Sequence, residues 1–488
     1  MPRLHAIALV AIVVVGAVAS RASAGVDELA QELRRLIAPG AADREQVLGA
    51  LRALKDDRLR PLFSELAVGD DMIGRVQGVL ALAESSDNAS ATTSMISRVA
   101  SPEEQTLMIV RTLRDGLLSD DQIQEIIAWP GIKEELEVLL RSHIRKAEDP
   151  SMVSRLEELS TNESPAVGVI ASLVLMDLGK PVDPESLMAR LREKAIATDS
   201  LGVAYLLDFI RREQLTGAAP FVQLVLETQG IDMMTRSDAL ATMLVVAPER
   251  GEEPWNRAWQ GAEGLVDQIR LALSAVSAWR TAPEDTLRAV ATSDNPVISA
   301  MGGAALAFST GKGEREKGLE LWKSGYAPGI EWMVSSIEYL DLEKRLELRR
   351  ALIESPIDGM RSDSLVLRML ADGMLEDDPS ALCQLARNAS MLADSRVARI
   401  TLSAITRAGR VECASEFDQL TWPDSGLTSL AQVVAAAAGN ESIRSDRLER
   451  TALGIGSLPR PARAVAAWEA LLRMGEERKA LAQILAAP

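Results

Sequence analysis

The feature that most constrains the fold is a pattern typical of a helix start, which recurs at a nearly constant distance along the second half of the chain. These helix starts lie at Asp294, Pro328, Asp363, Asp394 and Asp424, at spacings of 34, 35, 31 and 30 residues. A unit of about 30 to 36 residues is the length of one helical hairpin, which is too small to bury its own apolar face. The sequence therefore predicts an array of stacked helical hairpins.

Helical signals also run through the rest of the chain. Residues 26–37 carry apolar side chains at helical spacing and end at Pro39-Gly40. Asp43 with Gln46, Ser119 with Gln122, and Asp183 followed by Pro184-Glu185 are each typical of a helix N-terminus. No stretch alternates apolar and polar residues around a hairpin turn. The predicted fold class is all-α.

Five segments share turn residues followed by a helix of small and aliphatic residues. They are 70–82, 164–179, 294–306, 394–409 and 461–475. This pattern resembles the second helix of a HEAT-type repeat, a resemblance that implies an α-solenoid of stacked hairpins. Residues 464–488, with Trp468 and Gly475, also resemble a TPR hairpin, so TPR-like units and a non-solenoid helical fold remain alternatives.

Two charged stretches with Gly or Pro interrupt the helical pattern, at 248–254 and 309–314. The first predicts a loop that divides an N-terminal helical-repeat region, 25–247, from a C-terminal one, 255–488. A long loop between two hairpins of one array is the alternative.

The first 24 residues are typical of a secretory signal peptide. Arg3 precedes the apolar run 6–19, and Ala22-Ser23-Ala24 matches the small-x-small site that a signal peptidase cleaves. We expect cleavage after Ala24 and a periplasmic or secreted protein. A retained membrane anchor is the alternative, although the run is shorter than the roughly 20 residues that span a bilayer. No later segment predicts a membrane span.

Charge and composition narrow the classes of partner. The chain has 53 Lys and Arg against 70 Asp and Glu, a net charge of −17. Binding to nucleic acid needs a basic surface that neutralises phosphates, and the sequence contains no basic stripe. Nucleic acid and anionic membranes are thus poor partners, and we expect a protein or peptide. The sequence leaves the oligomeric state open.

The residues that catalysis and metal binding most often require are nearly absent. His143 is the one histidine left after signal cleavage, and it is expected at a helix C-terminus. Runs of carboxylates such as Asp56-Asp57 are expected to be solvated turns and helix caps. We predict no cofactor, no metal and no catalysis. Two alternatives remain: a purely structural envelope component, and a helical-toroid enzyme acting on an envelope polysaccharide, which the aromatic content of 3% disfavours.

Tryptophans cluster in one part of the sequence and suggest where a partner could bind. Five of the eight lie within 78 residues: Trp255, Trp259, Trp279, Trp322 and Trp332. Packing at hairpin contacts is the ordinary interpretation of such residues. The functional hypothesis is an aromatic patch on the concave face of the array, since tryptophan is enriched at binding hot spots.

The only two cysteines, Cys383 and Cys413, predict a disulfide. An exported protein folds where disulfides persist. The 30-residue separation matches the local repeat, so the two residues are expected on the first helices of consecutive hairpins. Two free buried cysteines are the alternative.

Overall fold

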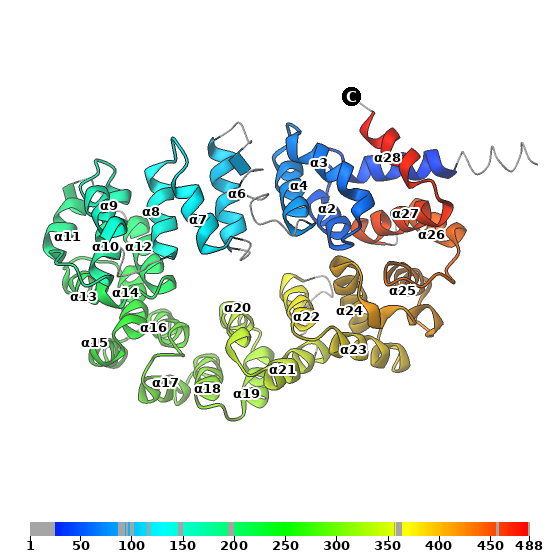
Figure 1. Ribbon diagram of the computed structural model, residues 1–488. Helices are drawn as coiled ribbons and strands as arrows, with labels where there is room; N and C mark the ends of the chain where they lie inside the picture. Colours follow the sequence, from blue (N-terminus) through cyan, green and yellow to red (C-terminus); the bar gives the residue numbers. More distant parts are fainter. Residues whose placement is uncertain are drawn as a thin grey trace, which may run out of the picture. The chain divides into compact units, whose positions relative to one another are not determined.

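The computed structural model describes residues 25–85, 93, 96–97, 102–114, 118–144, 150–193, 200–355, 357, 364–454 and 458–486. These residues form helices and turns and no strand, which confirms the all-α prediction (Figure 1). The predicted signal segment and its cleavage site lie outside them. Within the same described ranges, no helix is both long and apolar enough to cross a membrane.

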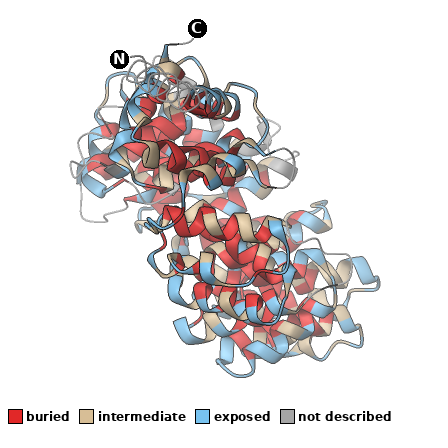
Figure 2. Ribbon diagram, turned by 90° about the vertical axis from the view of Figure 1, so that its right-hand side faces the viewer, coloured by how far each residue is buried: buried red, intermediate tan, exposed pale blue. Residues whose placement is uncertain are grey.

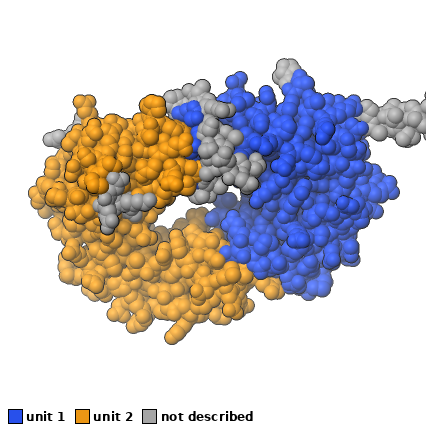
Figure 3. Space-filling view, viewed as in Figure 1, with its two compact units in different colours: residues 1–118, 359–488 blue, residues 119–358 orange. Residues whose placement is uncertain are grey.

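The chain forms two compact units, residues 1–118 with 359–488 and residues 119–358 (Figure 3). Unit 1 therefore combines the two ends of the chain, and unit 2 is the middle. These limits differ from the predicted regions 25–247 and 255–488. The sequence signal for that division was a loop at 248–254, and the structure shows it to be helical.

Unit 2 contains fifteen of the helices that the structure describes. They are α7 (Asp120–Ile127), α8 (Glu134–His143), α9 (Pro150–Ser160), α10 (Pro165–Asp177), α11 (Pro184–Glu193), α12 (Ser200–Arg212), α13 (Ala219–Glu227), α14 (Met233–Val246), α15 (Pro248–Gln260), α16 (Leu265–Ser277), α17 (Glu284–Ala291), α18 (Pro296–Thr310), α19 (Glu314–Lys323), α20 (Ala327–Ser336) and α21 (Leu342–Glu354), with the 3-10 turns η2 (Thr216–Ala218) and η3 (Ile337–Tyr339). Most helices pack on the next in sequence, and several also on the next but one, as α14 does on both α12 and α16.

Unit 1 begins with a helix over residues 25–37. It continues with η1 (Asp57–Leu59), η4 (Glu412–Ala414), η5 (Phe417–Gln419) and the helices α2 (Arg44–Ala53), α3 (Arg60–Val68), α4 (Met72–Ser85), α6 (Pro102–Arg114), α22 (Leu365–Asp377), α23 (Pro379–Met391), α24 (Ser395–Ala408), α25 (Ser425–Ala437), α26 (Ser445–Leu453), α27 (Arg460–Met474) and α28 (Glu477–Leu485). In both units, buried residues lie on the helix faces that pack together (Figure 2).

The N-terminal and C-terminal helices of unit 1 share one core. Helix α2 packs on α4 within its own segment, and on α24 and α27 from the other end of the chain. An ion pair of 2.7 Å joins Arg463 Nη2 to Glu32 Oε1, with both side chains largely buried. The turn after α24 comes so close to α2 that a Cβ at Gly409 would overlap the carbonyl group of Ala53. Gly409 also has a φ of 76°, which favours glycine.

The five segments that resemble HEAT-type helices are all helical, as predicted. They correspond to α4, α10, α18, α24 and α27. The recurring helix starts predicted from the sequence correspond to the starts of α18, α20, α22, α24 and α25, although Asp363 itself lies outside the described residues. Where the spacing falls to 30, between α24 and α25, the first helix of the hairpin is reduced to η4 and η5.

The expected loop at 248–254 is instead the first half of α15. Pro248 occupies the first turn, where a missing N–H costs nothing. Glu249 and Glu253 are exposed, whereas Gly251 and Trp255 are buried. The charged residues are thus the solvated face of an amphipathic helix, and the sequence interpretation as a loop was wrong.

Two of the three predicted helix N-terminal caps are present in the structure, and the third is not. Ser119 and Gln122 form the reciprocal capping box, and the Asp183 carboxylate accepts from the backbone N–H groups of Glu185 and Ser186 at 3.1 Å. Asp43 precedes α2 as expected but makes no side-chain capping bond, because its own φ is 56°. A cap needs an extended residue whose side chain faces the first turn.

Gly302 and Gly303, adjacent in α18, offer a test of how closely α17 and α18 pack. We expect Gly302→Ala to lower the free energy of unfolding by about 1–3 kcal/mol, since its Cβ would overlap the backbone of Val290 and Ala291. Gly303→Ala meets only the flexible Lys317 side chain and should stabilise the helix by up to about 1 kcal/mol. Chemical denaturation of both variants measures the difference. Equal effects would mean that α17 and α18 are further apart than described.

Candidate functional site

Three of the five clustered tryptophans are core residues. Trp255 and Trp322 have no exposed surface and Trp279 is 7% exposed. The Trp255 indole N–H donates to Ser274 Oγ at 2.9 Å and to the Leu271 carbonyl at 3.1 Å, and Trp322 donates to the Ser355 carbonyl at 2.7 Å. The hypothesis of a surface patch formed by all five residues is therefore wrong. The helical spacing of apolar residues places these tryptophans on helices but does not identify which face of each helix is buried.

A smaller aromatic cluster does reach the surface of unit 2. Trp279 contacts Phe308 edge to face, with ring centroids 5.7 Å apart, and Tyr339 at 6.4 Å. Phe308 stacks on Trp332 at 5.8 Å. Tyr339 is 60% exposed and Trp332 is partly exposed, while Trp279 and Phe308 form the floor beneath them. We call these four residues the aromatic cluster.

A cation lies over the exposed end of the aromatic cluster. The guanidinium carbon of Arg280 is 4.2 Å from the centre of the Tyr339 ring, the geometry of a cation–π contact. At the other end, the Trp332 indole N–H is buried without an acceptor among the described residues. The surface thus presents aromatic faces and a positive charge on an otherwise acidic protein.

Trp259, the last of the five, belongs to a separate part of unit 2. Its ring stacks on Trp255 within α15, with centroids 5.2 Å apart and planes 14° apart. It is partly exposed and covers the buried ring. Its position gives it a packing role, and among the described residues it makes no ring contact with the aromatic cluster.

The structure confirms the predicted pairing of the two cysteines. Cys383 and Cys413 form a disulfide with a Cα–Cα separation of 6.2 Å. Cys383 lies on α23, as expected, and α24 lies between the two in sequence. Cys413 is on the 3-10 turn η4 and not on a full helix, so the expected pair of stacked first helices is correct on one side only.

His143 is the last residue of α8 and is exposed, in agreement with its predicted position. Among the described residues, no three His, Cys, Asp or Glu side chains are grouped so that they could hold a metal ion. The carboxylate runs lie in turns and at helix ends. Asp56 is not solvated as expected, because its side chain is only 4% exposed.

Asp56 belongs to a group of polar side chains where the two ends of the chain meet in unit 1. Its carboxylate accepts from Arg58 Nε at 2.8 Å and from the Trp468 indole N–H at 3.1 Å, and it lies 3.6 Å from Arg410 Nη2. Burial raises the pKa of Asp56, but the hydrogen bonds from Arg58 and Trp468 outweigh it and hold the pKa below its usual value. We call these residues, with Glu469, the polar junction.

Glu469 follows Trp468 on α27 and is 5% exposed. Its Oε2 accepts from Arg473 Nη1 at 2.5 Å. Burial raises the pKa of Glu469, and the hydrogen bond from Arg473 only partly offsets this effect. Arg473 also donates to the Asn440 carbonyl at 2.9 Å and to the Ile443 carbonyl at 3.0 Å. It thereby provides hydrogen-bond donors for two backbone carbonyl groups in the segment that follows α25.

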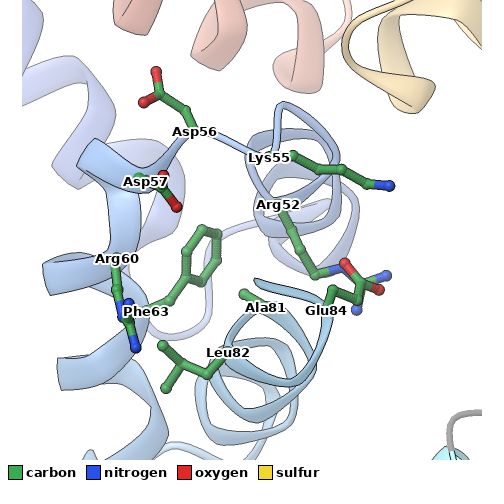
Figure 4. Close-up of a pocket in the computed structure, with 9 residues that line it drawn as sticks. All are labelled: Arg52, Lys55, Asp56, Asp57, Arg60, Phe63, Ala81, Leu82 and Glu84. Atoms are coloured by element: carbon green, nitrogen blue, oxygen red, sulfur yellow. The ribbon is translucent and has the colours of Figure 1, made fainter. Parts of the chain in front are cut away.

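Two cavities flank the polar junction. The smaller, of about 100 Å³, lies between α2, α3 and α4, with the Phe63 ring pointing into it and Arg52 beside Glu84 (Figure 4). In that view the Asp56 carboxylate points away from Phe63. The larger, of about 500 Å³, is lined by Arg58, Arg410, Glu441, Glu469, Arg473 and the end of α25. Small-molecule sites are typically about 300–1,000 Å³, so only the second has the size of one.

The polar junction could not be predicted from the sequence, because its members lie in three distant segments and Asp56 is part of a carboxylate run of the kind expected in a solvated turn. No protein-family model, curated protein or solved structure matches the chain.

Proposed function

We propose that the protein is a non-catalytic, exported helical-repeat scaffold that binds a protein partner in the cell envelope. In this proposal the hairpins form a HEAT-like α-solenoid, in keeping with helices that pack on the next and the next but one. Export is supported by the sequence of residues 1–24 and by a disulfide, since disulfides persist in oxidising compartments. Fold alone does not fix function, so the binding site carries the proposal.

The observation that carries it is the aromatic cluster with Arg280. The chain has 16 aromatic residues other than histidine, and four of them meet here. Tyrosine, tryptophan and arginine are the residues most enriched at binding hot spots. Tyr339 is exposed although its ring contacts Trp279, and so presents an anchored aromatic face at little loss of side-chain entropy on binding.

The partner segment that fits this surface is apolar with an acidic residue beside it. An aliphatic or aromatic side chain would cover Tyr339 and Trp332, and a carboxylate would pair with Arg280. Charge pairs at the edge of an interface act mainly on the association rate, and salt screens them. We therefore expect association to slow as ionic strength rises.

Site-specific crosslinking in cells tests the proposal. A photo-crosslinking residue replaces Tyr339 in one strain and Tyr205, a similarly exposed tyrosine on α12, in another. We expect a defined product from position 339 and none of the same mass from 205. The captured protein is then purified, and Tyr339→Ala should weaken its binding about 10- to 100-fold, whereas Tyr205→Ala should change it less than about twofold.

Two results would contradict this function. Identical crosslinks from both positions would mean that the surface is not selective. Unchanged affinity of the Tyr339→Ala protein for its captured partner would show that the aromatic cluster is not the interface. Circular dichroism of both variants serves as the control for folding. We expect both spectra to match that of the unsubstituted protein, because both tyrosine side chains are exposed.

A further inference from the structure

The larger cavity belongs to unit 1, whereas the aromatic cluster belongs to unit 2, and the two are lined by different kinds of residue. Its walls combine charged side chains with the apolar surface of Leu472 and of Ala436–Ala438, near the end of α25. It is bounded by four segments of the chain, around η1, after α24, at the end of α25 and along α27. Its size and mixed lining are those of a site for a small polar molecule.

The charges around the cavity are nearly balanced, which argues against a simple anion site. Arg58 is paired with Asp56, and Arg473 with Glu469. Arg410 also pairs with Asp56, over 3.6 Å, but its side chain is 52% exposed, and Glu441 is exposed with no ion pair among the described residues. One positively charged and one negatively charged side chain, Arg410 and Glu441, thus line the same cavity.

Glu469 supplies the second, independent observation. Its side chain is 6% exposed and lines the cavity, and only Oε2 is bound, by Arg473. Within the described part of the chain, no donor contacts Oε1. Oε1 is not one of the fully buried atoms that lack a partner, so it is reached from the cavity, and the N–H group of a ligand can donate to it.

We propose that this cavity binds a small zwitterion, a free amino acid or a short peptide with both termini free. The ligand carboxylate pairs with Arg410, and its ammonium group lies against Glu441 and donates to Glu469 Oε1. Leu472 and the alanines at the end of α25 contact its apolar part. Because the site is formed by segments from both ends of the chain, an occupied site stabilises unit 1 through mass action.

Isothermal titration calorimetry on the full chain tests the site with four probes. They are trialanine, an equimolar mixture of the twenty free amino acids, N-acetyl-trialanine amide and inorganic phosphate. We expect trialanine or the mixture to bind, and the blocked peptide and phosphate to give no binding at the same millimolar concentrations. Failure of both zwitterionic probes, or equal binding of phosphate or the blocked peptide, would overturn the proposal.

Variants then place the ligand in the cavity. Arg410→Gln and Glu441→Gln should each weaken binding about tenfold or more, since each removes a charged hydrogen-bonding partner of the ligand. Arg444→Gln is the matched control, an exposed arginine of unit 1 paired with Asp446. It should change the affinity less than about twofold. An equal loss in all three variants would refute the assignment, and circular dichroism checks that each is folded.

Discussion

Replacing Trp468 with alanine is expected to lower the free energy of unfolding by about 3–5 kcal/mol. The indole is fully buried on α27, and its N–H donates to Asp56 Oδ2 at 3.1 Å. The substitution leaves a cavity in the core that α2 and α27 share, and it removes one donor from a buried carboxylate. Trp468→Phe keeps most of the apolar contact and should cost only about 1–3 kcal/mol.

Hydrogen exchange followed by mass spectrometry locates the effect. In the alanine variant we expect faster exchange in α2 as well as in α27, because the two helices pack together although they come from opposite ends of the chain. Faster exchange in α27 with unchanged protection of α2 would contradict a shared core. Helices of unit 2 serve as the internal reference.

The second large effect is expected at Trp255, with Trp259 as its matched control one turn later on α15. Trp255→Ala should lower the free energy of unfolding by about 3–5 kcal/mol, because the ring is fully buried and its N–H has two acceptors from α16. Trp259→Ala removes a partly exposed ring stacked on the first and should cost about 0.5–1.5 kcal/mol.

Guanidinium denaturation of the two variants measures this contrast, with circular dichroism as the probe because each substitution removes a fluorophore. Similar, small effects would mean that Trp255 is not the core residue described. Similar, large effects would mean that Trp259 belongs to the core as well.

Local signals predicted the helices well because helix starts depend on neighbouring residues. The Ser119 box and the Asp183 cap are each complete within four residues of sequence, and both are present. The charged stretch at 248–254 was wrongly predicted to be a loop because it contains Pro and Gly. Whether these residues break a helix depends on tertiary contacts, and here the helix is kept by the close packing of Gly251 on α14.

The candidate sites were harder to predict because they depend on which helix faces meet. Spacing placed Trp255, Trp279 and Trp322 on helices, yet burial is decided by partners that sequence spacing does not identify. Nothing local distinguishes Asp56 from its exposed neighbour Asp57, and its burial follows from Trp468, 412 residues away. The cysteines were the exception, because two residues allow a single pairing.

The shared core of unit 1 has a consequence for the order in which the chain folds. Contacts in unit 2 are mostly between successive helices and form quickly, whereas α2 must wait for α27, which is synthesised far later in the chain. Until then the apolar faces of residues 25–37 and α2 lack their final partners. These N-terminal helices are thus expected to be prone to aggregation, and to need a holding chaperone, while the rest of the chain is being synthesised.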